Sequence, residues 1–174
     1  GVEPNPKLSF VEEVLAKNYD FEMILAVGGG SVIDTAKSIA VSYKSGIDPW
    51  KFNSHEVTPQ KSMPIGVVLT LSAAGSEMSS SCVITNLELK IKQGFNSEVV
   101  RPLFAIMNPE YTFSVNKYQT ACGIVDIMMH TLERYISNED SMLADEFAIG
   151  LLKTVIKNGK IAYEDPTNYQ ARKE

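Results

Sequence analysis

The sequence predicts an α/β fold in which a parallel-sheet part is followed by an all-helical part. Short continuous apolar runs, typical of strands buried on both faces of a parallel sheet, recur before residue 110. Segments of helical period flank the first of these runs, as in half of a doubly wound unit. No strand pattern remains from Ser114 onward. We therefore predict two parts, residues 1–110 and 111–174, with the boundary near 109–113.

The α/β part begins as helix, strand, glycine turn and helix. Helical spacing of apolar residues predicts a helix at 8–17, and the run "MILAV" predicts a strand at 23–27. Three glycines at 28–30 follow the strand, and helical period returns at 31–43. The side chains expected on the inner face of this helix are Ile33, Ala36, Ala40 and Tyr43.

The middle of the chain adds two buried strands and a hairpin. β-favouring residues on either side of Leu87 and Glu88 predict the hairpin. The other expected elements are a polar loop at 44–63 with a turn near Trp50, a strand at 64–71, a small-residue segment at 72–81, and a strand at 103–109 that Pro109 ends.

Helices account for the rest of the chain. Period predicts them at 116–137 and 140–158, and Pro166 opens a third. Apolar residues surround more of the 140–158 helix than one neighbour could cover. We therefore expect residues 1–174 alone to expose an apolar patch large enough to drive association. A homo-oligomer is a separate expectation for the whole protein.

Composition argues against several classes of protein. The net charge is −5 with no Lys/Arg-rich block, which argues against a nucleic-acid partner. No apolar run reaches the ~18 residues of a membrane helix, and the N-terminal sequence is unlike a signal peptide, so we expect no membrane partner. Cys82 and Cys122 form no motif and are expected to be small buried residues in a reducing, cytoplasmic location.

The glycine turn has two interpretations. Gly28, Gly29 and Gly30 could reach positive φ and approach a phosphate at the N-terminus of the following helix. They could equally form a tight structural turn, because the G-x-G-x-x-G dinucleotide pattern is absent. Ser31 and Asp34 have the S-x-x-D spacing of a capping box, which predicts that the Asp34 carboxylate turns back to the Ser31 N–H. The segment "SAAGSE" is similarly either a ligand site at a strand end or a flexible linker.

Asp126 and His130 lie four residues apart, in the predicted helix 116–137. This spacing places a carboxylate and an imidazole on one helix face, where they form either a core contact or part of a metal site. Glu133 is either a partner of His130 or a solvated charge near Arg134. His55 lies in the polar loop and is expected to be exposed.

Four separated motifs resemble, in order and spacing, the iron-containing (group III) alcohol dehydrogenase family, of the butanol dehydrogenase and lactaldehyde reductase type. They are "AVGGGSVIDTAKSIA", "TLSAAGSEMSSSCVIT", "NPEYT" and "GIVDIMMHTLERYIS". The resemblance implies the dehydroquinate-synthase-like fold, with an N-terminal domain that binds NAD or NADP and a helical C-terminal domain that carries a divalent metal, Fe(II) or Zn(II).

The resemblance also implies roles for individual residues. Gly28, Gly29, Gly30 and Ser31 match the pyrophosphate loop. Thr70 and Leu71 match a nucleotide-contacting threonine pair, of which only the first is threonine here. Lys92 matches a lysine near the nicotinamide ribose, and Asp126 and His130 match the first two of four metal ligands.

The implied reaction is metal-assisted hydride transfer between a small primary alcohol or aldehyde and NAD(P), for which no protein base is needed. The open alternatives are a glycerol-dehydrogenase or dehydroquinate-synthase-like enzyme, and a non-catalytic nucleotide-binding protein. The family's opening strand and its two further metal-binding histidines have no counterpart in this sequence. We therefore expect a central piece of a longer enzyme, with both parts incomplete and residues 1–174 inactive alone.

Overall fold

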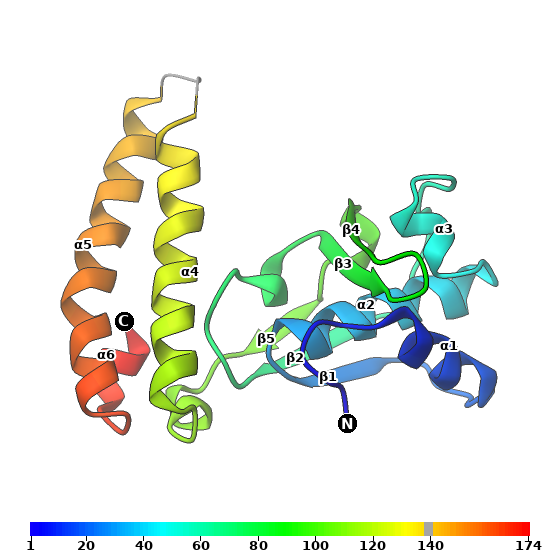
Figure 1. Cartoon of the computed structure of the whole chain (residues 1–174), viewed down its shortest axis with the longest axis horizontal. Coiled ribbons are helices and arrows are strands. Elements are labelled where there is room, and N and C mark those ends of the chain that lie inside the picture. Colours follow the sequence, from blue (N-terminus) through cyan, green and yellow to red (C-terminus); the bar gives the residue numbers. More distant parts are fainter. Residues whose placement is uncertain (138–140) are drawn as a thin grey trace. The chain divides into compact units, whose positions relative to one another are not determined.

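The chain forms two compact units in the computed structural model, which describes residues 1–137 and 141–174 (Figure 1). The α/β unit comprises Gly1–Leu69 and Gly75–Ile106. The helical unit comprises Met107–Glu174 together with the short segment Thr70–Ala74. Among the described residues, no helix has both the length and the apolar character that crossing a bilayer requires.

The α/β unit contains the strands and helices that the apolar pattern predicts and one short helix, Trp50–Asn53, within the segment predicted to be a polar loop, where Phe52 and Asn53 are buried. In chain order they are α1 (Leu8–Ala16), β1 (Ile24–Gly28), α2 (Gly30–Ser45), α3 (Trp50–Asn53), β2 (Ile65–Leu69), β3 (Ser81–Asn86), β4 (Ile91–Asn96) and β5 (Phe104–Ile106), with single 3-10 turns at Ser76–Met78 and Glu98–Val100.

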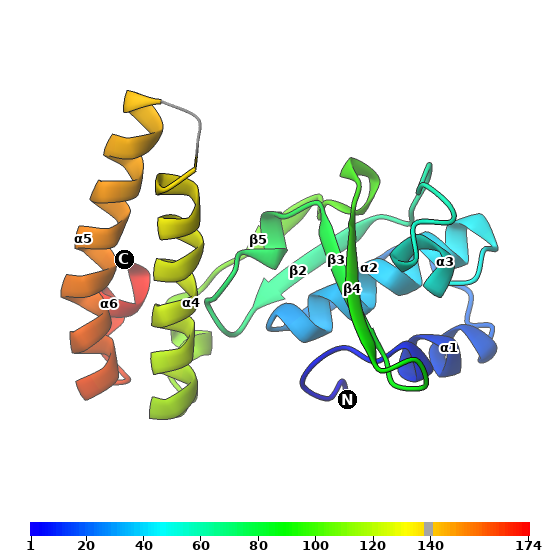
Figure 2. The same cartoon turned by 45° about the horizontal axis from the view of Figure 1, so that its top comes forward.

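A three-stranded parallel sheet, in the order β1-β2-β5, forms the base of this unit. Helix α2 runs beside β2 (Figure 2) and buries one face of the sheet, including Ala26 and Val67. The prediction that the strands are buried on both faces is wrong: Leu25 and Val27 are 50% and 56% exposed. They point to the face opposite α2, because successive side chains of a strand alternate between faces.

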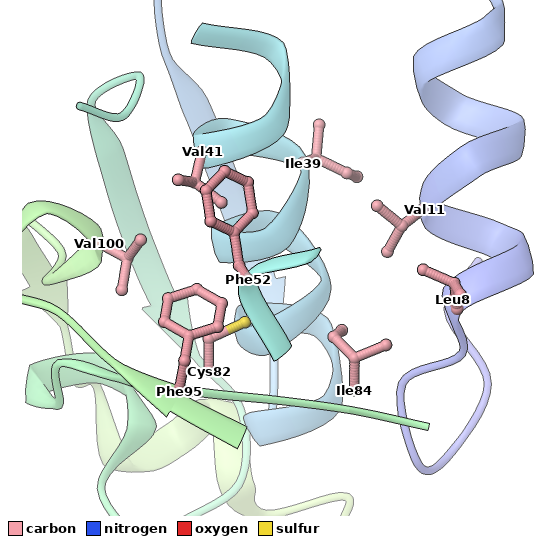
Figure 3. Packing of buried hydrophobic residues seen from close by; sticks show 9 residues of the cluster. All are labelled: Leu8, Val11, Ile39, Val41, Phe52, Cys82, Ile84, Phe95 and Val100. Carbon is pink, nitrogen blue, oxygen red and sulfur yellow. The ribbon is translucent and has the colours of Figure 1, made fainter. Parts of the chain in front are cut away.

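Helix α2 separates two apolar clusters. The first lies between α2 and the sheet and includes Ile33, Ala36 and Ala40, as predicted, with Tyr43 packed at its edge. The second joins α2 to α1, α3 and the antiparallel β3-β4 hairpin. Its members, shown in Figure 3, are Leu8, Val11, Ile39, Val41, Phe52, Cys82, Ile84, Phe95 and Val100. Burial on two sides explains why small residues are frequent along α2.

The helical unit consists of the 3-10 turn Pro109–Thr112 and the helices α4 (Lys117–Tyr135), α5 (Met142–Glu164) and α6 (Tyr169–Lys173). Asn116, Ser141 and Asn168 cap the N-termini of the three helices by accepting a backbone N–H bond. Helix α5 continues past the predicted end at residue 158, because the first helix-breaking signal is Pro166. The predicted start of this helix at Asp140 lies outside the described residues.

Helices α4 and α5 pack against each other, yet α5 keeps a large apolar surface exposed. Met142 and Phe147 are 83% and 70% exposed, and Leu143 and Ile156 are exposed as well. The apolar patch predicted for this helix is therefore present.

Candidate functional site

The glycine turn joins the carboxyl end of β1 to the first turn of α2. Gly29 is the N-cap residue, and no side chain caps the helix. The first backbone N–H groups of a helix have no partner within the helix, and the helix dipole is positive there. The turn is therefore chemically suited to an anion such as a diphosphate.

The three glycines are not required for positive φ, contrary to the sequence-based prediction. The glycines with positive φ in the described part of the chain are Gly46 and Gly75. Gly28 is instead explained by packing, because a Cβ there would lie 2.5 Å from a Val32 methyl carbon. A Cβ at Gly30 would meet only the Ser76 Cβ, at 4.0 Å. Space beside Gly30 is thus left open by the protein itself.

The predicted capping box is absent. Helix α2 begins at Gly30, so Ser31 is not the N-cap. The Asp34 carboxylate accepts hydrogen bonds from the Ser76 hydroxyl at 2.5 Å and from the Val83 N–H at 3.0 Å. Burial raises the pKa of Asp34, although these two hydrogen bonds act in the opposite direction. Asp34 therefore links Ser76 and Val83 to α2 through hydrogen bonds instead of capping the N-terminus of its own helix.

Lys37 is a feature of this region that sequence reasoning missed. Its side chain is fully buried, and its ammonium group lies 3.9 Å from Asp34. The helical phase could have revealed it, because residue 37 lies on the same face of α2 as Ile33 and Ala40.

Ser31 and Lys92 meet through the N-terminal segment. The Asn5 N–H donates to the Ser31 hydroxyl oxygen at 3.1 Å, and the Lys92 ammonium donates to the Asn5 side-chain oxygen, also at 3.1 Å. Both predicted nucleotide-contacting residues therefore lie near the start of α2, with Lys92 exposed at the surface. Lys92 therefore adds positive charge near the uncapped N-terminus of α2.

Thr70 and Leu71 belong to the helical unit, where the segment 70–74 lies against α4. A Cβ on Gly123 would be 2.4 Å from the Ser72 carbonyl oxygen, so glycine permits this close approach. Leu71 also lines a cavity of about 200 Å³ within the helical unit. Arg172 lines the same cavity and donates to the Thr120 hydroxyl at 3.2 Å, and burial lowers its pKa.

Asp126 and His130 occupy one face of α4. The Asp126 Oδ1 and His130 Nε2 atoms are 3.8 Å apart, and their side chains are 45% and 43% exposed. The alternative of a buried core contact is therefore wrong. Glu133 Oε2 is 3.7 Å from His130 Nδ1, with its side chain 79% exposed. The donor types and the spacing fit a first-row metal ion.

Glu133 lies near the other ring nitrogen of His130, and no group of three or more His, Cys, Asp or Glu side chains among the described residues is arranged to hold a metal ion. Cys122, one turn before Asp126, is exposed, so the prediction that it is buried is wrong. Cys82 is buried as predicted, and burial raises the pKa of its thiol well above the ordinary value. His55 is exposed as predicted.

The chain is thus a two-part protein. A parallel-sheet unit with an uncapped glycine turn is followed by a helical unit that carries a half-buried carboxylate–imidazole pair. Residues 1–109 match the family model described as iron-containing alcohol dehydrogenase. Residues 120–174 match the C-terminal model of the Fe-containing alcohol dehydrogenase family. The chain belongs to the iron-containing alcohol dehydrogenase family.

Known relatives and solved structures agree with this assignment. The chain is 42% identical to NADH-dependent butanol dehydrogenase A of Clostridium acetobutylicum, over 99% of the chain and 45% of the relative. It is 40% identical to the NADPH-dependent aldehyde reductase YqhD of Escherichia coli, over 99% of the chain and 46% of the relative. The chain thus spans about half the length of the curated relatives it matches.

Two crystal structures extend the similarity to three dimensions. NADH-dependent butanol dehydrogenase A of Thermotoga maritima matches with a TM-score of 0.95 and 39% identity, over 99% of this chain and 44% of that one. Sulfoacetaldehyde reductase of Bifidobacterium kashiwanohense, solved in complex with NAD+, matches with a TM-score of 0.89 and 31% identity, over 98% and 46% of the two chains. The fold predicted from the sequence is confirmed.

Proposed function

We propose that the protein carrying this chain is an NAD(P)-dependent oxidoreductase that interconverts small primary alcohols and aldehydes with the help of a divalent metal. The observation that carries the proposal is the Asp126–His130 pair, half-buried and one turn apart on α4 of a chain in this family. The relatives named above are an NADH-dependent butanol dehydrogenase and an NADPH-dependent aldehyde reductase.

In this proposal the α/β unit holds the nucleotide. The uncapped turn Gly28–Gly29–Gly30 and Ser31 receive the diphosphate through backbone N–H groups, with Lys92 adding positive charge nearby. The nicotinamide, once bound, supplies the hydride chemistry, and the protein supplies binding and orientation.

The helical unit holds the metal through Asp126 and His130. A bound Fe(II) or Zn(II) ion would act as a Lewis acid on the substrate oxygen. Catalytic sites of comparable metals use about three protein ligands. Asp126 and His130 would therefore need at least one further protein ligand, which the described residues do not place beside them.

Oligomerisation and location complete the proposal. Exposed Met142, Leu143 and Phe147 on α5 support self-association, and a dimer is the simplest symmetric assembly. Two cysteines without a disulfide support a reducing, cytoplasmic location.

The test uses the native protein, Fe(II) or Zn(II), and a short aldehyde with NADH or NADPH, followed by nicotinamide absorbance. Asp126→Ala and His130→Ala should each abolish reduction and lower the metal content measured by elemental analysis, while far-ultraviolet circular dichroism stays unchanged. His55→Ala is the matched control, because His55 is the exposed histidine of the α/β unit. If either α4 variant kept full metal content and activity, the metal assignment would be wrong.

A further inference from the structure

Lys37 is a buried cation that the proposed function does not use. Its ammonium group donates to three backbone carbonyls, those of Ser76 at 2.8 Å, Ser79 at 2.9 Å and Ser81 at 2.8 Å, and it lies 3.2 Å from the Ser76 hydroxyl oxygen. An ammonium group has three N–H donors, so the three carbonyls can occupy all of them. Burial lowers the pKa of Lys37, and the nearby Asp34 carboxylate acts against this shift.

The three carbonyls all belong to one short loop, residues 76–81. A fourth carbonyl of this loop, that of Met78, accepts from the Arg101 guanidinium. The main-chain bonds of this segment are the Met78 N–H to Gly75, the Ser79 N–H to Ser76 and the Ser97 N–H to Ser80, and Ser81 begins β3. Four of the six carbonyls in residues 76–81 thus accept from a cationic side chain, three of them from Lys37.

The 76–81 loop is seated against the first turn of α2, where the diphosphate is proposed to bind. The Ser76 hydroxyl donates to Asp34, and the Ser76 Cβ would be the nearest atom to a side chain at Gly30. Any change in the path of this loop would therefore alter the space beside the glycine turn.

Structural stability alone is a weak explanation for such a lysine. Removing an ammonium group from water costs several kcal/mol, and a packed apolar side chain at the same place is often as stable. What an apolar side chain cannot do is hold three carbonyl oxygens at one point, because their dipoles repel one another without a cation between them.

We propose that Lys37 is a positioning residue for nucleotide binding: its ammonium group serves as an internal cation that folds the 76–81 loop onto the glycine turn. This inference rests on the proposed function, because it assigns the glycine turn to the diphosphate. Lys37 itself is fully buried and acts through the loop.

The central experiment replaces Lys37 by Ala in the native protein and measures the Kd of NADH and NADPH by titration calorimetry. If the loop keeps its native path only about a tenth of the time, the apparent Kd rises about tenfold. n-Propylammonium supplies the three carbons and the charge removed by this substitution, and it should restore most of the affinity in a saturable manner. n-Butanol, a neutral molecule of similar length, should not.

Two further variants keep the outcome interpretable. Lys37→Met fills the space without charge, so it should bind nucleotide weakly and fail to respond to n-propylammonium, even if Lys37→Ala does not fold. Lys44→Ala removes an exposed lysine from the same helix and should leave the Kd unchanged.

Two results would overturn the inference: a folded Lys37→Met protein with the Kd of the unmodified protein, or equal rescue of Lys37→Ala by n-butanol and n-propylammonium. Failure of the proposed function can be told apart from failure of this inference, because the unmodified protein would then bind neither NADH nor NADPH. In that case the cation role is decided by the melting temperature of Lys37→Ala, which n-propylammonium should raise and n-butanol should not.

Discussion

Gly123→Ala should destabilise the helical unit, because it places a methyl group where the chain has no room. An ideal Cβ at residue 123 lies 2.4 Å from the Ser72 carbonyl oxygen. Carbon–oxygen contacts in proteins fall at about 3.3–3.6 Å, so the segment 70–74 and α4 would have to separate by roughly 1 Å. The obstructing atom is backbone, which cannot move away by rotating a side chain.

The size of the effect follows from two opposing terms. Overpacking costs about 1–3 kcal/mol, and a backbone neighbour places this site near the upper end of that range. Replacing Gly by Ala within a helix returns about 1 kcal/mol. The net loss in the free energy of unfolding should therefore be about 2 kcal/mol.

Gly150→Ala is the matched control. Gly150 lies within α5, and an added Cβ there meets no atom within 4 Å. This variant should gain up to about 1 kcal/mol from helix propensity alone. Urea unfolding followed by far-ultraviolet circular dichroism measures both variants. A Gly123→Ala protein as stable as Gly150→Ala would refute the close approach of α4 to the segment 70–74.

Three further predictions concern the α/β unit and the thiols. Gly30→Ala should weaken nucleotide binding in calorimetry without loss of stability, since the protein leaves room for that Cβ. Gly28→Ala should instead lower the urea midpoint, because its Cβ clashes with a side chain of α2. Equal nucleotide affinity for Gly30→Ala and the unmodified protein would argue against a phosphate role. Burial raises the pKa of Asp34 above its ordinary value of 3.8, so the folded state binds more protons than the unfolded state in the interval between the two values. The free energy of unfolding should therefore fall as the pH rises from 3.8 through the folded-state pKa, and Asp34→Asn should remove that part of the slope in urea titrations at a series of pH values; an unchanged slope would contradict the shift. Dithionitrobenzoate should modify Cys122 in the folded protein but Cys82 only after denaturation, and rapid reaction of both thiols would contradict the burial of Cys82.

The order of elements could be predicted from the sequence because apolar periodicity is a local property. The strand "MILAV" and the helix after the glycine turn were recognisable from residues close in the chain. Burial of both faces of that strand was not predictable in the same way. An apolar run shows that Leu25 and Val27 favour an apolar neighbour, but it does not show which segment covers them.

The candidate site shows the same contrast between local features, which the sequence predicts, and contacts between distant segments, which it does not. Asp126 and His130 could be paired because a separation of four residues fixes their geometry on a helix. The partners of Asp34 could not be found from spacing, since Ser76 and Val83 follow it by 42 and 49 residues. The partners of Lys37 are harder still to predict, because they are backbone carbonyls, which leave no signature in the sequence.

The assignment of Thr70–Ala74 to the helical unit has a consequence for dissecting the protein. The backbone passes between the two units three times, after Leu69, after Ala74 and after Ile106. A single truncation therefore cannot release either unit intact. Cutting after Ile106 would separate α4 from the segment 70–74, which contacts Gly123. That segment would remain between β2 and the 76–81 loop without the helix it packs against. The two units are thus expected to require joint expression, and limited proteolysis should yield nicked but associated pieces.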